Sequence, residues 1–229
     1  DYRSNDKMNS DKNFIPLMID LSNRKIVIFG AGSVGERKAL LFSTYADTTV
    51  VSTSFTSRMR ELEDKGCIKL KPSNINSLSD SEITELISNS FMVIPATNNK
   101  QLNDRITEIA NKKNILVNQV DDIGDVIVPS VIKRGDLTIG ISTLGSSPAL
   151  SKFTRENIEQ VITPQYSGMS RIQNDMRSYL KNVVSEQKKR KEILWKIMDD
   201  ESVWKALSDS YEKARSEERR VGKECTLRC

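Results

Sequence analysis

Short apolar runs alternate with stretches of helical periodicity over the first half of the chain. The runs occupy residues 26–29, 48–51, 68–70, 91–94 and 115–117, and the helical stretches between them occupy 36–45, 56–65, 80–87 and 101–111. The runs are apolar without strict alternation, which is typical of strands that are buried on both faces. Strands that alternate with helices predict a parallel sheet covered by helices on both sides, which we assign to residues 14–117.

The pattern changes after residue 117. Two runs rich in β-branched residues, 126–132 and 137–142, are joined by a short turn that contains Gly135. This arrangement predicts a β-hairpin. The hairpin has no obvious place in the first sheet, so we expect residues 118–148 to form a separate small element or an interface.

The remainder of the chain is helical in pattern. We expect a C-terminal helical domain over residues 149–214, with a first helix that begins near Pro148 and is broken by Pro164. The apolar face of that helix comprises Leu150, Phe153, Ile158, Val161 and Ile162. Residues 215–229 show no periodicity and hold two of the three cysteines, so we interpret them as a non-native or disordered tail.

The composition excludes several classes of chemistry. The 229 residues include no histidine, which excludes Ser-His-Asp and Cys-His catalysis and every His-ligated metal site. The three cysteines match neither a zinc site nor a redox pair, and we expect no metal centre. Proton transfer must therefore use carboxylates, lysine, tyrosine, cysteine, water or the substrate.

The charge and the hydropathy limit the partners. The net charge of +4 suits a small anionic molecule and is too weak to indicate nucleic-acid binding. No run approaches the roughly 18 apolar residues that a membrane span requires, and the polar N-terminus has no signal-peptide pattern. We therefore expect a cytoplasmic protein that does not bind membranes.

A glycine-rich loop follows the first predicted strand and opens the first predicted helix. Its sequence is Gly30-Ala31-Gly32-Ser33-Val34-Gly35. In this strand–helix context the three glycines serve a tight turn, a close approach of the backbone to a pyrophosphate, and close packing of helix on strand. Backbone N–H groups at the start of the helix then bind the phosphates. We therefore predict a Rossmann-like dinucleotide site.

The end of the second strand departs from the general rule for this site. An acidic residue is expected there to hold the adenosine ribose, but the chain has Ser52-Thr53-Ser54. No arginine stands at the strand end for a 2′-phosphate, and the nearest is Arg58. Because the hydroxyl groups of Thr53 and Ser54 can bond the ribose, we predict NAD rather than NADP as the cofactor.

Two adjacent carboxylates follow the fifth predicted strand. Asp121 and Asp122 come directly after Asn118-Gln119-Val120. Ligands of open α/β sheets bind outside the carboxyl ends of the strands, which places this segment near the nicotinamide end of a dinucleotide. The pair could accept a proton or coordinate a metal ion. It could equally cap a turn, which is a common use of aspartate.

Several motifs in order resemble those of the precorrin-2 dehydrogenase / sirohydrochlorin ferrochelatase family, which includes the N-terminal module of siroheme synthases. The resemblance extends from about residue 14 to 162 and, more weakly, to about 214. The motifs are PL at 16–17, GERKA at 35–39, ATNN at 96–99, LVN with VD at 116–121, VPS at 128–130, and Ser142 with GSSPAL at 145–150. A methyltransferase domain is not included, so the chain resembles the stand-alone form.

The resemblance implies a function and roles for individual residues. The family oxidises precorrin-2 to sirohydrochlorin with NAD, and chelation of Fe²⁺ by sirohydrochlorin is a second reaction that it leaves open for this chain. Asp121 matches the family's catalytic aspartate. Ser33, Val34, Thr53 and Ser54 match its NAD contacts, and Thr97 lies in a segment that lines the cofactor crevice. Asn98-Asn99 stands where acidic residues are common, which argues against a metal ligand in that stretch.

The implied substrate carries several carboxylates, so cationic contacts are needed. The candidates for contacts to the substrate are Asn118, Arg37, Lys38, Lys133, Arg134, Lys152 and Arg155. Ordinary surface charge is the competing explanation for each basic residue. The family also implies a homodimer that uses the hairpin and the C-terminal helices, with the substrate in a cleft between the Rossmann-like domain and those helices.

Two other functions fit the same sequence. A regulatory module that senses NAD without catalysis would need the glycine loop but neither Asp121 nor a tetrapyrrole. A chelatase without dehydrogenase activity would insert a metal ion without consuming NAD⁺. Turnover of precorrin-2 with and without NAD⁺ distinguishes these alternatives.

Overall fold

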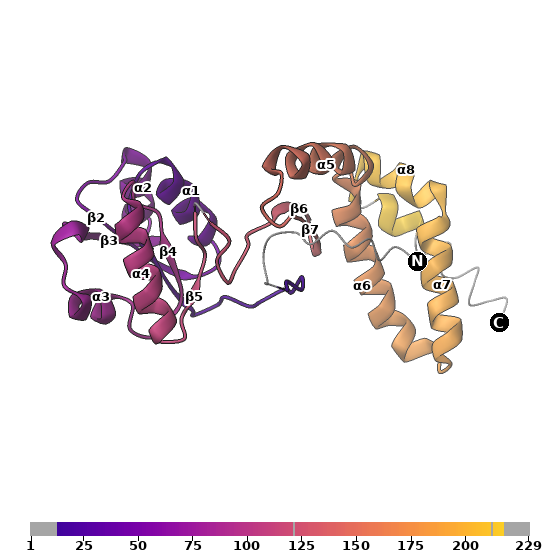
Figure 1. The fold of residues 1–229 in the computed structure, drawn as a ribbon. Helices are drawn as coiled ribbons and strands as arrows, with labels where there is room; N and C mark the ends of the chain where they lie inside the picture. Colours follow the sequence, from indigo (N-terminus) through magenta and orange to yellow (C-terminus); the bar gives the residue numbers. More distant parts are fainter. Residues whose placement is uncertain (1–12, 121, 212, 218–229) are drawn as a thin grey trace, which may run out of the picture. The chain divides into compact units, whose positions relative to one another are not determined.

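A computed structural model describes residues 13–120, 122–211 and 213–217 (Figure 1). The chain divides into two compact units, Asp1–Val128 and Pro129–Cys229. Most of the predicted tail, residues 218–229, lies outside the described residues, as do residues 1–12.

The first unit is built on a parallel sheet of five strands in the order β3-β2-β1-β4-β5. The strands are β1 (Lys25–Phe29), β2 (Asp47–Ser52), β3 (Ile68–Pro72), β4 (Ser90–Pro95) and β5 (Leu116–Val117). Phe29 pairs with Val51 on one side and with Pro95 on the other. The carboxyl ends of β1, β2 and β4 therefore meet at one edge of the sheet.

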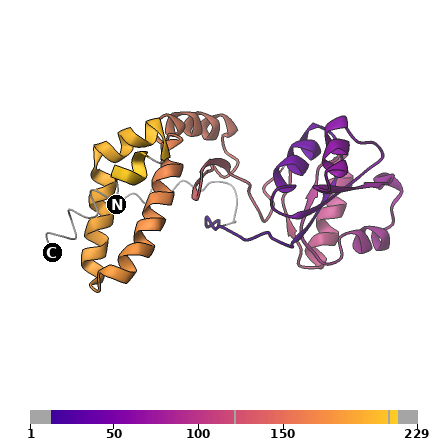
Figure 2. The same cartoon turned by 180° about the vertical axis from the view of Figure 1, so that it is seen from behind.

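Helices cover both faces of this sheet (Figures 1 and 2). The helices are α1 (Ser33–Phe42), α2 (Ser57–Asp64), α3 (Asp80–Leu86) and α4 (Lys100–Lys112), with a short 3₁₀ turn η1 (Ile75–Ser77). Alternate residues of β1 point to opposite faces, so Val27 and Phe29 pack with α3 and α4, while Ile26 and Ile28 pack with α1 and α2. The predicted α/β sheet is confirmed, with each strand and helix within a few residues of its predicted place.

The segment from 126 to 129 differs from its prediction as the start of the hairpin. The first hairpin strand, β6, begins only at Ser130. Val126 and Val128 instead pack, partly buried, against the cluster that contains Ile26 and Ile28. The apolar run in this segment therefore reflects packing on the α1–α2 side of the first sheet.

The second unit contains a two-stranded antiparallel hairpin followed by helices (Figure 1). Its elements are β6 (Ser130–Arg134), β7 (Leu137–Ile141), α5 (Pro148–Val161), α6 (Gln165–Val183), α7 (Gln187–Asp199) and α8 (Glu201–Asp209). Gly135 in the hairpin turn has φ +61°, a backbone conformation that favours glycine. The predicted break at Pro164 is confirmed, because α5 ends at Val161 and α6 begins at Gln165.

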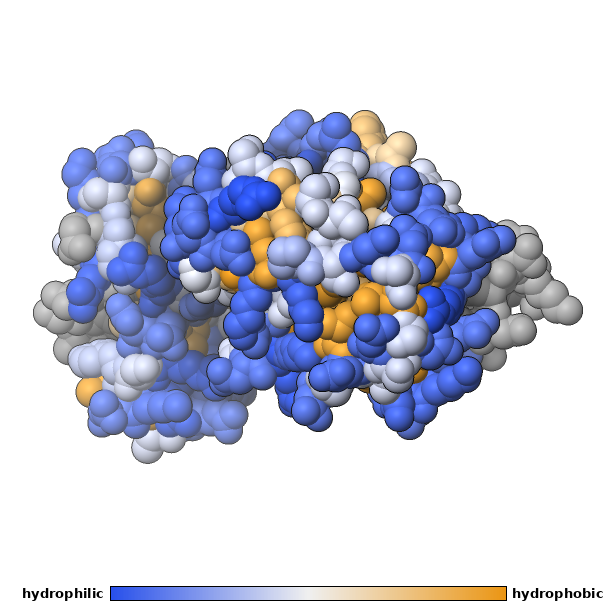
Figure 3. Space-filling model, turned by 90° about the vertical axis from the view of Figure 1, so that its left-hand side faces the viewer, coloured by the Kyte–Doolittle hydropathy of each residue, from blue (hydrophilic) through white to orange (hydrophobic). Residues whose placement is uncertain are grey.

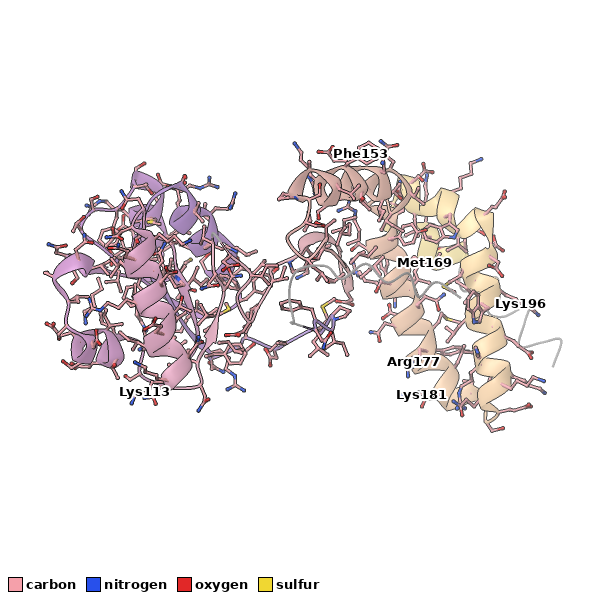
Figure 4. All side chains as sticks on the ribbon, in the orientation of Figure 1. Lys113, Phe153, Met169, Arg177, Lys181 and Lys196 are labelled. Carbon is pink, nitrogen blue, oxygen red and sulfur yellow. The ribbon has the colours of Figure 1, made fainter. Side chains whose placement is uncertain are left out.

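A second apolar core lies between α6, α7 and α8. Met169, Ile172, Met176 and Leu180 line one side of α6 and are buried against apolar residues of α7 and α8. Met169 points from α6 toward α7 in the stick view (Figure 4). By contrast, none of the described residues of α5 is buried.

The described helices include none that is long and apolar enough to cross a membrane. The face of the molecule seen in Figure 3, which is the side of the first unit, is mainly hydrophilic with smaller apolar areas between polar side chains. The cytoplasmic location stays a prediction.

Candidate active site

A cavity of about 410 Å³ lies in the first unit, where β1, β2 and β4 end. Four segments contribute to it: the glycine loop, the end of β2, the loop after β3 and the loop after β4. The described residues that line it include no ionisable side chain, and they are Gly30, Ala31, Gly32, Ser33, Val34, Ser52, Thr53, Asn74, Ile75, Asn76, Ala96, Thr97, Asn98 and Leu102. The cavity thus lies where dinucleotides bind in open α/β sheets, at the reversal of strand order between β1 and β4.

Each glycine of the loop has a different structural requirement. Gly30 has φ +104°, and a Cβ atom there would collide with the carbonyl oxygen of Ala96. A Cβ atom on Gly35 would collide with the carbonyl oxygen of Gly30. The absence of a side chain at Gly35 therefore lets α1 pack tightly against the end of β1. A Cβ atom on Gly32 would meet nothing within 4 Å, because this residue faces the open cavity. The turn at Gly30 and the close packing at Gly35 need glycine, and the pyrophosphate role of Gly32 stays a prediction.

The first turn of α1 lacks a side-chain cap. Gly32 is the N-cap residue and offers no side chain to accept from the first N–H groups of the helix. In the same unit, Thr56, Ser79 and Asn99 cap α2, α3 and α4 through their side chains. Uncapped N–H groups at a helix N-terminus, with the helix dipole behind them, form an anion site. The N-terminus of α1 opens into the cavity, because Gly32, Ser33 and Val34 line it.

Of the two hydroxyl residues predicted to bind the ribose, the structure places one in the cavity. Thr53 lines it directly after β2, while the neighbouring Ser54 is exposed and is not among the lining residues. Ser52 lines the cavity as well and was not predicted. The assignment of Thr53 and Ser54 to the ribose stays a prediction.

The loop after β3 supplies a wall that the sequence analysis missed. Asn74, Ile75 and Asn76 line the cavity, and the side-chain amide of Asn99, in the turn after β4, donates to Asn76 Oδ1 across 3.5 Å. Polar residues directly after a predicted parallel strand were the available signal, because the carboxyl ends of all these strands lie at one edge.

Thr97 lines the cavity after β4 and is held by Asn103 of α4. The backbone N–H and the hydroxyl of Thr97 both donate to Asn103 Oδ1, at 3.1 and 2.6 Å. Asn103 Nδ2 donates to the carbonyl oxygen of Thr97 at 3.0 Å. Asn103 is 8% exposed and does not line the cavity.

The loop after β5 contains the predicted catalytic carboxylate. Asp121 itself lies outside the described residues. Asp122 is exposed and accepts the N–H of the adjacent residue, Ile123, at 2.7 Å. Asp125 accepts the N–H of Val117 at 3.1 Å and donates its own N–H to the Val117 carbonyl, so the chain returns beside β5.

Asn118, a predicted substrate contact, is buried beside this loop. It is 4% exposed, and its side-chain amide donates to the carbonyl oxygen of Val126 at 2.7 Å. Its Oδ1 is buried and has no hydrogen-bond partner among the residues that the structure describes. An unpartnered buried amide oxygen is costly and can accept a hydrogen bond from a ligand or from water.

Two predicted substrate contacts lie on α1. Arg37 is exposed and Lys38 is half-buried. Burial, and secondarily the charge of Arg37, lower the pKa of Lys38 from 10.5 to about 8. Neither side chain forms an ion pair within the described part of the chain. Lys38 is therefore a cation whose charge is available to an anionic ligand.

The other four basic candidates lie in the second unit. Arg134 donates to the carbonyl oxygen of Ile162. The carboxylate of Glu159 lies 3.9 Å from the guanidinium of Arg134 and 2.8 Å from that of Arg155. Lys152 pairs with Glu156 at 3.8 Å, and Lys133 is exposed on β6. Internal partners thus account for Arg134, Lys152 and Arg155, and the role of all four in substrate binding stays a prediction.

Comparison with known proteins agrees with the dinucleotide site that the geometry indicates. A family model described as "Putative NAD(P)-binding" matches residues 17–130, which span the sheet and the cavity. The chain is 58% identical over 207 residues to precorrin-2 dehydrogenase of Methanosarcina barkeri, covering 90% of this chain and 92% of the relative. This chain belongs to the precorrin-2 dehydrogenase family.

A more distant relative and a solved structure agree with the family assignment. A siroheme synthase of Actinobacillus pleuropneumoniae is 29% identical over 90% of this chain, which spans 41% of that longer protein. The solved structure of SirC, a precorrin-2 dehydrogenase, is similar with a TM-score of 0.72 and 25% identity, covering 92% of this chain and all of SirC. The precorrin-2 dehydrogenase fold therefore includes the sheet, the hairpin and the C-terminal helices.

No group of three or more Cys, Asp or Glu side chains that could hold a metal ion occurs among the residues the structure describes. Precorrin-2 dehydrogenase chemistry requires a hydride acceptor, and the cavity beside the glycine loop is suited to hold it.

Proposed function

We propose that this chain oxidises precorrin-2 to sirohydrochlorin with NAD⁺. One observation carries the proposal: the glycine loop and its cavity at the carboxyl ends of β1, β2 and β4 occur in a chain that is 58% identical to a precorrin-2 dehydrogenase over nearly the full length of both. The function is an oxidoreductase step of siroheme biosynthesis, as the siroheme synthase relatives also indicate.

The residues of the cavity fit a dinucleotide. The pyrophosphate is assigned to the uncapped N–H groups of α1, with Gly32 leaving room for it. Thr53 is assigned to the ribose next to it. The absence of a carboxylate among the lining residues leaves hydroxyl and amide groups to bind the sugar. We propose NAD over NADP because no arginine or lysine lines the cavity to pair with a 2′-phosphate.

The oxidation removes a hydride and a proton from the macrocycle. The bound cofactor supplies the hydride acceptor, and the protein orients the two molecules. We assign the proton to Asp121, because its loop follows β5 at the same edge of the sheet, and because the chain has no histidine to act instead. Asp122 already accepts the neighbouring N–H of Ile123, which favours the first carboxylate of the pair.

An anaerobic absorbance time course tests the function. Precorrin-2 should be converted to sirohydrochlorin only when NAD⁺ is present, with NADH formed in equal amount. Binding of NAD⁺ without turnover would instead identify a sensing module. Addition of Fe²⁺ after turnover is complete then measures chelation, which is the second reaction that the family implies.

We also propose that the chain forms a homodimer through the hairpin and α5. Leu150, Phe153 and Val161 on α5 are 53%, 62% and 68% exposed, and Val131 of β6 is 45% exposed. Phe153 projects from α5 in the stick view (Figure 4). Exposed apolar residues gathered on one helix and one strand are typical of an interface. Both strands of the hairpin also keep an edge that pairs with no described strand of this chain.

A further inference from the structure

We infer that Asn103 is a positioning residue for the dinucleotide and that it acts through Thr97. This inference rests on the proposed function, because it assigns a role within the proposed cofactor cavity. Asn103 lies on the buried side of α4, one turn before Ile106, and Thr97 lies at the cavity wall.

The side-chain amide of Asn103 is used almost entirely on one residue. Its oxygen accepts both donors of Thr97, the backbone N–H at 3.1 Å and the hydroxyl at 2.6 Å, and its nitrogen donates to the Thr97 carbonyl at 3.0 Å. These contacts also fix the orientation of the amide, since the oxygen faces two donors and the nitrogen faces an acceptor. All three polar groups of Thr97 are thereby fixed in place.

The position of Thr97 in turn sets the width of the cavity beside the glycine loop. A Cβ atom on Gly30 would lie 3.0 Å from the backbone nitrogen of Thr97 and would collide with the Ala96 carbonyl. The turn after β4 is therefore in close contact with the turn after β1. A displacement of Thr97 would therefore move the cavity wall formed by the turn after β4. It would also loosen the contact that this turn makes with the glycine loop after β1.

An asparagine on the buried side of a helix needs such a reason. At 8% exposure, Asn103 lies in a stripe formed otherwise by Leu102, Ile106, Ile109 and Ala110. Leucine there would satisfy the core and favour the helix. An amide is retained at a cost in desolvation that only its hydrogen bonds offset. Those hydrogen bonds serve the cavity wall rather than the core.

The test compares Asn103→Leu with Ile106→Val, a core substitution on the same helix that does not reach the cavity. The dissociation constant for NAD⁺ is measured by titration calorimetry on the full chain without precorrin-2, and thermal unfolding is followed in parallel. Steady-state assays then give kcat and the KM of each substrate.

Asn103→Leu should raise both the dissociation constant and the KM for NAD⁺ by about tenfold, the scale of roughly one lost hydrogen bond. The KM for precorrin-2 should change little. Ile106→Val should lower the unfolding temperature without changing NAD⁺ affinity. If Asn103→Leu does not fold, Asn103→Asp takes its place, since it keeps the size and the accepting oxygen but loses the donor to the Thr97 carbonyl, and it too should weaken NAD⁺ binding.

A double-mutant cycle with Thr97→Val identifies the route of the effect. If Asn103 acts through Thr97, the two substitutions together should weaken NAD⁺ binding by less than the product of their separate effects. Wild-type affinity in the folded Asn103 variant would overturn the inference, and so would an equal loss in Ile106→Val. Failure of the wild-type chain to bind NAD⁺ would overturn the proposed function itself.

Discussion

The side-chain amide of Asn118 donates to the carbonyl oxygen of Val126, 2.7 Å away. Asn118 is the first residue after β5. Val126 lies where the chain returns to the sheet, since its backbone N–H, like that of Asp125, donates to the carbonyl oxygen of Val117. Gly124 stands so close to the Val117 carbonyl that a Cβ atom there would collide with it. The ends of the loop that contains Asp121 and Asp122 are therefore fixed to the sheet.

Asp121→Ala should reduce the rate of precorrin-2 oxidation by about 10²-fold or more, which is the range for loss of a general base. The affinity for NAD⁺ should change little, because the pyrophosphate is assigned to α1. Steady-state oxidation and calorimetric binding of NAD⁺ measure the two quantities separately.

Asp122→Ala is the matched control for that prediction. Its carboxylate is exposed and bonded to the next N–H, so the variant should keep most of the activity. An inactive Asp122 variant beside an active Asp121 variant would show that the assignment is wrong by one residue. Full activity in both would assign the proton to water or to a substrate carboxylate.

Gly32→Asp should abolish NAD⁺ binding in a protein that still folds. A Cβ atom at this position meets nothing within 4 Å, so the fold tolerates a side chain, but the carboxylate would lie in the proposed pyrophosphate site and repel the pyrophosphate. Calorimetry and thermal unfolding check the two parts. Gly32→Ala is the control, and it should bind NAD⁺ more tightly than Gly32→Asp because it adds no charge. Equal NAD⁺ affinity in Gly32→Asp and wild type would contradict the phosphate site.

The chain should prefer NAD⁺ to NADP⁺ as the hydride acceptor. The lining residues near Thr53 are neutral, so the extra phosphate of NADP⁺ would lose hydration without gaining an ion pair. The ratio of kcat/KM for the two cofactors measures the preference. Similar values would show that Thr53 and Ser54 do not bind the ribose as predicted.

The kcat/KM for precorrin-2 should fall as the pH rises through about 8. Burial lowers the pKa of Lys38 to about 8, and a neutral lysine cannot pair with a substrate carboxylate. The pH profile of kcat/KM reports the free enzyme and is measured for wild type and Lys38→Met. The variant should have a lower value near neutral pH and should lose this step; an unchanged profile would exclude Lys38 from substrate binding.

The stability of the same variant is an independent check on Lys38. Its folded-state pKa lies below its ordinary value of 10.5, so between about pH 8 and 10.5 the unfolded chain binds more protons than the folded one. Stability therefore rises with pH across this window in the wild type. Lys38→Met should remove that part of the rise, as measured by chemical unfolding at each pH.

Phe153→Glu should convert a dimer into a folded monomer. Phe153 is 62% exposed in the single chain, so a charge there has no cost within the fold but would be buried in the proposed interface. Sedimentation equilibrium gives the mass, and Lys196→Glu, an exposed position on α7, controls for added negative charge. A wild-type protein that is monomeric at high concentration would contradict the proposal.

The sheet and the glycine loop could be predicted from the sequence because their signals are local. The runs at 26–29 and 91–94 are apolar enough to specify buried strands, and the strand–glycine–helix order specifies the phosphate turn. The loop of Asn74 and Asn76 was missed although it follows a predicted strand, because the sequence does not show that β3 pairs with β2 and so brings this loop to the cavity. Asn103 was missed for a related reason, since its partner is known only once α4 packs beside the end of β4.

The uncharged lining of the cavity has a consequence for how the enzyme responds to ionic strength. The cofactor is assigned to backbone dipoles and neutral side chains, which added salt screens only weakly within a partly enclosed cavity, whereas the substrate carboxylates are assigned to cationic side chains that include the exposed Arg37. Raising the salt concentration should therefore leave the nucleotide bound while it weakens capture of the tetrapyrrole. Cofactor binding and substrate binding thus differ in their dependence on salt, so the salt concentration can be used to weaken substrate binding while the cofactor stays bound.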